Sequence, residues 1–243
     1  MRISKRIIFF IFFSFLVFVT HAESKKLTIL CDIWPPYQTV ENGRLSGFST
    51  KIVSIIFKRM GADVATFKPY PWKRAILMIE RGKADALFSA NFTKARADFA
   101  FYPDEPIVTS PWVIWGNKDN KIEFRSFDDL YGKTVGIVRG YSYTPEFWNF
   151  AKKYNVYVEV PNDEMNFKKL NAGRIDFALA EFGNGVHIVK RLNLNKIIPF
   201  VKNPVKTDGL YIIFNKKTVS TSFVNAFSKE LKKLKKKVLP KFI

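Results

Sequence analysis

Residues 72–89 read WKRAILMIERGKADALFS, and this stretch decides the fold class. Its first half carries apolar residues at helical spacing, and Gly82 stands where the helix should stop. Its second half, residues 84–89, is a short apolar run typical of a buried strand. A helix followed directly by a buried strand is one repeat of an α/β fold with a mostly parallel sheet.

The same alternation extends to both sides of this stretch. Strands are predicted at residues 27–31, 84–89, 133–138, 156–160 and 175–180, and helices at residues 51–60, 72–81 and 164–171, with a further helix that Thr144 caps and Pro145 opens. Two such α/β units are joined through residues 111–116, and the chain returns through residues 209–215. We therefore expect two lobes around a cleft, with two crossings that serve as a hinge.

The N-terminus reads as an export signal. Residues 1–22 have a basic start, an apolar run from Ile7 to Val19, and a small residue, Ala22, before the expected cut. The apolar run is shorter than the roughly 20 residues that span a bilayer, so an uncleaved anchor is the second interpretation. A lipid anchor would need a cysteine at the cut, and Cys31 lies too far downstream. A cleaved signal predicts a periplasmic protein.

The charge balance is unusual, with 40 Lys and Arg against 21 Asp and Glu, a formal net charge of +19, and about +16 once residues 1–22 are removed. Export argues against a nucleic-acid partner. The basic residues are scattered except for a lysine cluster at residues 232–237, on a predicted amphipathic helix. A solvated helix face is the first interpretation of this cluster, and contact with anionic lipid or an envelope polymer is the second.

Cysteine content limits the possible metal and disulfide chemistry. Cys31 is the only cysteine, which excludes an internal disulfide and any site built from several cysteines. We expect no metal, no cofactor and no catalytic residue in this chain.

Seven short motifs follow one another along the predicted mature chain. They are WPPY at residues 34–37, GF at 47–48, Trp72 with GKADA at 82–86, TKAR at 93–96, DLYGKTVG at 129–136, GYS at 140–142 and AGRIDFALAE at 172–181. In this order, behind a signal peptide, they resemble bacterial extracellular solute-binding protein family 3, the periplasmic receptors that feed polar amino acids to ABC importers. The resemblance implies a two-lobed type II periplasmic-binding fold, with lobe 1 at residues 23–111 and 209–243 and lobe 2 at residues 112–208.

The resemblance gives Arg96 the central role. In the family, the arginine that closes this TKAR-like stretch holds the carboxylate of the ligand. A guanidinium suits that role because its fixed fork of donors matches a carboxylate in two parallel hydrogen bonds. The alternative for Arg96 is a surface ion pair with an acid such as Asp98, which contributes little.

The resemblance to the family also implies the other expected ligand contacts. Glu181 stands where relatives that bind α-amino acids carry an aspartate, so we expect it to hold the ammonium group across the cleft from Arg96. The remaining predicted contacts surround the ligand with aromatic rings, hydroxyl groups and an amide: Trp34, Tyr37, Trp72, Ser89, Asn91, Tyr141 and Ser142.

One position at the end of the first strand departs from one branch of the family. Cys31 stands where some receptors for cationic amino acids place an aspartate. Its neighbour Asp32 is expected to point to the other face of the sheet, because side chains alternate along a strand. The sequence therefore leaves the side chain of the ligand open.

Three functions are consistent with these observations. The main hypothesis is a monomeric, non-catalytic receptor that binds an amino acid by hinge closure and delivers it to an ABC permease in the inner membrane. The second is a periplasmic cyclohexadienyl or arogenate dehydratase on the same scaffold, with Glu181 as proton donor; His187 is the only histidine outside the leader, and no nucleophile-elbow motif is present. The third is a ligand-sensing partner of a membrane receptor.

Overall fold

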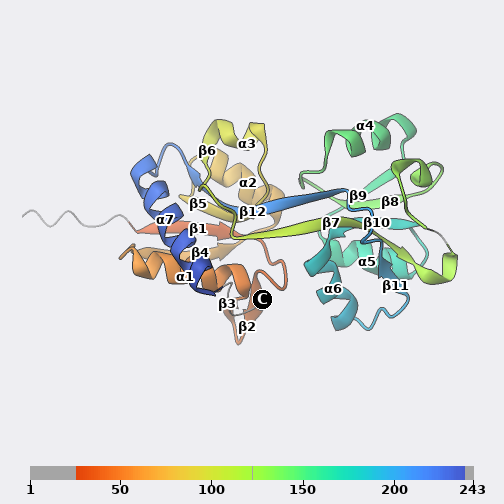
Figure 1. Cartoon of the computed structure of the whole chain (residues 1–243), viewed down its shortest axis with the longest axis horizontal. Helices are drawn as coiled ribbons and strands as arrows, with labels where there is room; N and C mark the ends of the chain where they lie inside the picture. Colours follow the sequence, from red (N-terminus) through yellow and green to blue (C-terminus); the bar gives the residue numbers. More distant parts are fainter. Residues whose placement is uncertain (1–25, 122, 239–243) are drawn as a thin grey trace, which may run out of the picture.

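The computed structural model describes residues 26–121 and 123–238, so the predicted signal peptide lies outside the described residues. The chain forms two α/β lobes, drawn at the left and right of Figure 1. Among the described residues no helix is both long and apolar enough to cross a bilayer. The predicted fold class, two lobes with a cleft between them, is confirmed.

Lobe 1 holds the first part of the chain and its C-terminal helix. Its strands are β1 (Leu27–Cys31), β4 (Val64–Pro69), β5 (Ala86–Ala90), β6 (Ala100–Phe101) and the hairpin β2 (Thr39–Glu41) and β3 (Arg44–Ser46); its helices are α1 (Phe48–Arg59), α2 (Trp72–Glu80), α3 (Lys94–Phe99) and α7 (Thr221–Val238). Strand β1 pairs in parallel with both β4 and β5. Helices α1 and α7 pack against each other over one apolar core of this lobe.

Lobe 2 repeats the pattern. Its strands are β8 (Val135–Val138), β9 (Tyr157–Val160), β10 (Phe177–Glu181) and β11 (Ile197–Pro199); its helices are α4 (Pro145–Tyr154), α5 (Asp163–Asn171) and α6 (Phe182–Arg191), with short 3-10 turns η1 (Lys118–Asn120) and η2 (Phe127–Leu130). Strand β8 pairs in parallel with β9 and with β10. The helix expected after Thr144 begins as predicted, because the Thr144 hydroxyl accepts a hydrogen bond from the N–H of Phe147.

Two long strands connect the lobes. Strand β7 (Val108–Asn117) and strand β12 (Lys206–Asn215) run antiparallel from one lobe into the other (Figure 1). Their ends join different sheets, since β12 pairs with β5 in lobe 1 and β7 pairs with β10 in lobe 2. The lobe limits at residues 111 and 208 remain a prediction, and both fall within these two strands.

This topology determines where a site can form. The carboxyl ends of β1 and β5 in lobe 1 and of β8 and β9 in lobe 2 point toward the space between the lobes. The loops that follow these strands therefore meet there, as in other open α/β sheets. Those loops carry most of the residues that the sequence singled out.

Candidate functional site

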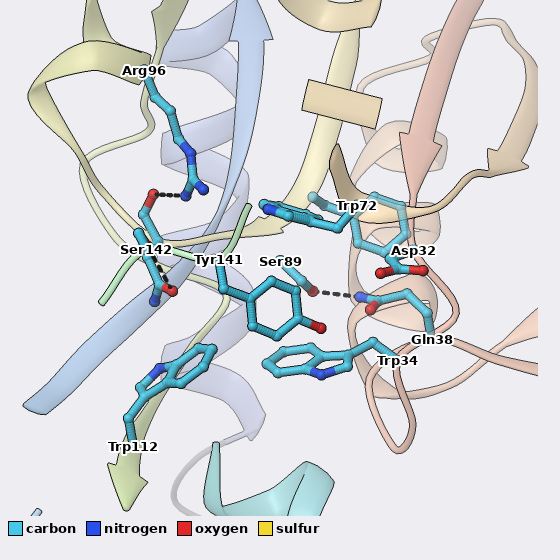
Figure 2. A pocket seen from close by; sticks show the side chains of 11 residues that line it. Asp32, Trp34, Gln38, Trp72, Ser89, Arg96, Trp112, Tyr141 and Ser142 are labelled. Atoms are coloured by element: carbon cyan, nitrogen blue, oxygen red, sulfur yellow. Dashed lines mark hydrogen bonds between the residues drawn. The ribbon is translucent and has the colours of Figure 1, made fainter. Parts of the chain in front are cut away.

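A cavity of about 330 Å3, including its opening to solvent, lies between the two lobes. Figure 2 shows the side chains that surround it. They come from strand ends of both lobes: Asp32, Trp34, Gln38, Trp72, Phe88, Ser89, Asn91, Arg96, Trp112, Tyr141 and Ser142. Seven of the nine residues predicted from the sequence are in this set, and Tyr37 and Glu181 are outside it.

Arg96 enters the cavity from helix α3. The helix begins at Thr93, whose hydroxyl accepts a hydrogen bond from the Arg96 N–H and so orients the first turn. The guanidinium donates through Nη1 to the carbonyl of Asn91 at 2.9 Å and lies over the Trp72 ring, 5.2 Å from its centroid. Arg96 is only 7% exposed, and burial lowers its pKa. Within residues 26–121 and 123–238 no carboxylate forms an ion pair with it.

Four aromatic rings form the walls of the cavity beside Arg96. Trp34 stacks on Trp112 with centroids 6.0 Å apart, and Tyr141 meets the edges of Trp34, Trp72 and Trp112. Such rings provide a rigid apolar surface that also attracts cations over its faces. Trp112 was not predicted from the sequence, because it lies in the hinge strand β7, away from the seven motifs.

Polar groups at the cavity are partly satisfied by each other. Ser142 donates to the Asn91 side chain at 3.4 Å, and Asn91 donates to the carbonyl of Gly209 at 3.1 Å. Ser89 accepts from Gln38 and sits at a positive φ of 65°, a costly conformation for serine that often occurs at functional sites. Trp112 Nε1 and Gln38 Oε1 are buried and have no hydrogen-bond partner in the described part of the chain. One donor and one acceptor of residues that line the cavity are thus unpaired in the described part of the chain.

The structure corrects the expected position of Glu181. Glu181 is completely buried and caps helix α6, accepting hydrogen bonds from the N–H groups of Gly183 at 2.8 Å and Asn184 at 2.7 Å. Its Oε1 also accepts from Tyr37 OH at 2.9 Å and from the Ser110 hydroxyl. The expectation that Glu181 faces Arg96 across the cavity is wrong, because four donors already occupy its carboxylate.

This network predicts a structural phenotype for Glu181. Replacing Glu181 with alanine leaves three buried donors and one partly buried donor without this acceptor, and we expect the free energy of unfolding to fall by about 2–4 kcal/mol without any ligand. Urea denaturation of the wild type and the variant measures this difference. Unchanged stability together with lost solute affinity would return Glu181 to the role of a ligand contact.

Two other carboxylates lie between the lobes, Asp32 at the cavity and Asp163 in the groove that adjoins it. Asp32 lies at the opposite end of the cavity from Arg96 (Figure 2), which overturns the expectation that it faces away. Burial, then the charge of Asp163, raises the Asp32 pKa to about 7, although N–H groups of Ile33 and Trp72 act in the opposite direction. Alternation failed to predict this orientation because β1 ends at Cys31.

Asp163 comes from the other lobe, at the first turn of α5. Its Oδ2 accepts hydrogen bonds from Trp34 Nε1 at 2.9 Å and Tyr141 OH at 3.1 Å. Its buried Oδ1 has no partner among the described residues, and burial raises its pKa to about 6. Sequence reasoning missed Asp163, although its place just after the predicted strand 156–160 was a usable signal.

Asp32 and Asp163 also line a wider groove that continues outward from the cavity and is shared with Trp34 and Tyr141. Glu164 lies in this groove as well but is paired with Lys168 and Arg191. No lysine or arginine of the described residues forms an ion pair with Asp32 or Asp163. The site therefore has a cationic end at Arg96 and an anionic end at this carboxylate pair.

Residues 27–239 match the family model of bacterial extracellular solute-binding proteins, family 3. The chain belongs to this family. The match spans both lobes and the two connecting strands, which agrees with the architecture described above. Among the described residues, no three His, Cys, Asp or Glu side chains gather into a metal site.

Individual relatives are more distant. The L-cystine-binding protein TcyJ of Escherichia coli K12 is 26% identical over 171 residues, which is 66% of this chain and 60% of that protein. The chain thus aligns with less than two thirds of that relative. A histidine kinase sensor domain with similarity to periplasmic binding proteins has a TM-score of 0.78 at 20% identity, over 88% of this chain and 91% of that one.

A third relative comes from work on glutathione import via GshT and the cystine ABC importer TcyBC of Streptococcus mutans. It also has a TM-score of 0.78, at 21% identity, and covers 88% of this chain and 90% of that chain. Both structural likenesses establish the fold. They do not assign a ligand, because the same fold appears in a sensor and in an import system.

Proposed function

We propose that this family member is a monomeric periplasmic receptor that binds a small dipolar solute, an amino acid or a close analogue, between its lobes and delivers it to an ABC importer. One observation carries the proposal: the Arg96 guanidinium is buried at the cavity without an ion pair in the described residues. The charge of Asp208 acts on Arg96 without forming an ion pair with it, and a buried charge without an ion pair is costly, so its retention favours an anionic ligand group.

The carboxylate of the solute is assigned to Arg96. Nη1 of the guanidinium donates to the Asn91 carbonyl, and this hydrogen bond holds the group in place over Trp72. The other N–H groups of the guanidinium remain as donors for a carboxylate. The unpartnered Trp112 Nε1 supplies another donor at the same cavity. A carboxylate bound here would therefore accept from donors that have no partner among the described residues.

The ammonium group of the solute is assigned to the Asp32 and Asp163 end. Three acceptors gather there: the Asp32 carboxylate, Asp163 Oδ1 and Gln38 Oε1, the last two without partners in the described chain. An ammonium group brings several donors and a positive charge, which keeps both carboxylates ionised. The aromatic rings between the two ends would cover the carbon skeleton.

Closure follows from the distribution of these groups over both lobes. The lobes already touch through Trp72 Nε1, which donates to the Gly140 carbonyl at 3.0 Å, and through the bonds of Trp34 and Tyr37 to lobe 2. In this arrangement Asp163 of lobe 2 lies close enough to Asp32 of lobe 1 for its charge to act on it. A solute that contacts both lobes therefore binds the closed form more tightly and shifts the population toward it.

The alternatives have less support. The dehydratase hypothesis depended on Glu181 as a proton donor, and Glu181 lies outside the cavity. A sensing role would use the same closure, with a membrane receptor in place of the permease to read the closed form. The family description is that of a solute-binding protein, which favours transport.

A melting-shift screen tests the proposal directly. Residues 23–243, the expected exported form, are heated with each standard amino acid, common analogues and small peptides. One dipolar solute is expected to stabilise the protein by about 2.7 kcal/mol at a hundredfold excess over its Kd. Incubation with prephenate or arogenate is the control for catalysis. No response in the whole panel, or formation of an aromatic product, would contradict the proposed function.

A further inference from the structure

The last three turns of helix α7 carry an unusually uniform surface. Every fully exposed position between residues 229 and 237 is a lysine: Lys229, Lys232, Lys233, Lys236 and Lys237. The opposite face of the helix is apolar and is buried in the core of lobe 1 through Phe227, Leu231 and Leu234. The helix is therefore held in place by its apolar side and presents a row of lysines to solvent.

Helix α1 extends this surface. It packs beside α7 (Figure 1), contains no acidic residue, and exposes Lys51, Lys58 and Arg59 along one stripe. Ile55 lies in the same stripe and is 42% exposed. We call the exposed basic residues of both helices the α1–α7 basic face: Lys51, Lys58, Arg59, Lys229, Lys232, Lys233, Lys236 and Lys237.

Little negative charge balances this face. Glu230 is the only acid of α7 and is partly buried; it pairs with Lys233 at 2.7 Å. Arg59 and Lys229 also act on Glu230, because their charges lower its pKa. Lys233 is the one member of the face that forms an ion pair within the described part of the chain. Among the described residues Glu230 is thus the one carboxylate paired with this face of eight cations, and Glu105 pairs with Lys235 of the same helix at 3.3 Å.

The chemistry of the face favours an extended anionic surface over a single anion. Lysine ammonium groups are separate, strongly hydrated point charges, whereas a pocket for one phosphate or carboxylate typically uses arginine forks and buried donors. An anionic bilayer attracts such a cluster additively, with a gain for each lysine near the surface. The exposed Ile55 lies among the basic residues of α1 and offers an apolar contact to the bilayer.

We propose that the α1–α7 basic face is a docking surface for an anionic phospholipid bilayer. This inference goes beyond solute binding and does not depend on it, because no residue of α1 or α7 lines the cavity or its outer groove. Docking through this face holds lobe 1 at the membrane and leaves the residues of the cleft unoccupied. A receptor held there stays close to any membrane protein that reads its closed form.

Vesicle sedimentation of residues 23–243 tests the proposal without the apolar leader. The protein is expected to sediment with vesicles that contain phosphatidylglycerol at low salt, and to remain in solution with pure phosphatidylcholine or at 0.5 M salt. The triple variant Lys229→Glu, Lys232→Glu and Lys236→Glu should bind at least tenfold more weakly. A matched variant with the same change in net charge, Lys152→Glu, Lys153→Glu and Lys190→Glu, alters exposed lysines of lobe 2 and should stay within about twofold of the wild type.

Several outcomes would overturn the proposal. Equal loss in both triple variants would show that net charge, rather than this face, drives binding. Binding to a soluble polyanion without binding to vesicles would replace the bilayer with another partner. Thermal melting of each variant, with and without the solute found in the screen, checks that the fold and the solute site are intact. Docking and solute binding can therefore fail separately.

Discussion

Replacing Arg96 with alanine is expected to raise the Kd for the solute at least a hundredfold. The variant removes the buried cation to which we assign the solute carboxylate, and truncating one partner of a buried, hydrogen-bonded charge pair costs about 2–5 kcal/mol. Isothermal titration with the solute identified by the melting screen measures the loss. Arg96→Lys should recover only part of the affinity, because an ammonium group cannot copy the two parallel hydrogen bonds of a guanidinium.

The matched control for this experiment is Arg74→Ala. Arg74 lies on the neighbouring helix α2, also contacts an aromatic ring, and does not line the cavity. Its loss should change the Kd less than twofold. Urea denaturation of the free Arg96 variant distinguishes lost binding from lost folding. An Arg96→Ala protein that folds and binds with wild-type affinity would remove the observation on which the proposed function rests.

The second large effect is a pH dependence with opposite signs for stability and for binding. Asp32 and Asp163 have pKa values of about 7 and about 6 in the folded protein, raised from 3.8 mainly by burial. At pH values between the unfolded pKa and these folded pKa values, the folded state binds more protons than the unfolded state. The free energy of unfolding therefore falls as pH rises from about 4 to about 7. At about 1.4 kcal/mol for each unit between the folded and unfolded pKa values, the pair should cost on the order of 7 kcal/mol over this window.

Solute affinity should change in the other direction. An ammonium group at this end of the cavity needs the carboxylates ionised, so the Kd should fall as pH rises through about 6 to 7. Physically, the solute replaces the protons that otherwise allow two carboxylates from opposite lobes to approach each other. Titration calorimetry between pH 5 and pH 8 measures this dependence.

The variant Asp163→Asn isolates the pair from the other titrating groups. Its amide oxygen can still accept from Trp34 and Tyr141, so the fold should be retained while the slope of stability against pH becomes flatter. Glu164 and Glu230 have lowered pKa values and act only below about pH 4.5. His187 has a lowered pKa, so its titration makes the free energy of unfolding rise with pH, opposite to the effect of the two aspartates. Identical pH profiles of the wild type and the variant would contradict the assignment.

The proposed receptor has its recognition groups at the ends of parallel strands and its hinge in antiparallel ones. This division has a mechanical reason. Strands β7 and β12 pair with each other between the lobes, so a small rotation there moves whole lobes without breaking the sheets on either side. Lys206, on β12, reaches the Ser142 carbonyl at 2.7 Å and thereby joins the hinge to the cavity wall.

The sequence by itself determined the α/β class, the two lobes and the family. Local signals carried this information: apolar spacing predicted the helices and strands, Thr144 predicted a cap, and the ordered motifs placed Arg96 at the site. Such signals act within a few residues of each other, so they can be read without knowing how distant segments pack.

Only the tertiary structure decided which carboxylates reach the cavity. Asp32, Asp163 and Glu181 all lie at or just after strand ends, so their position along the strands does not separate them. Glu181 is held away from the cavity partly by Tyr37 and Ser110, which lie far away in the sequence, whereas Asp163 accepts a hydrogen bond from Trp34 of the other lobe. The role of a buried carboxylate depends on the donors that surround it, and those donors come together only when the chain folds.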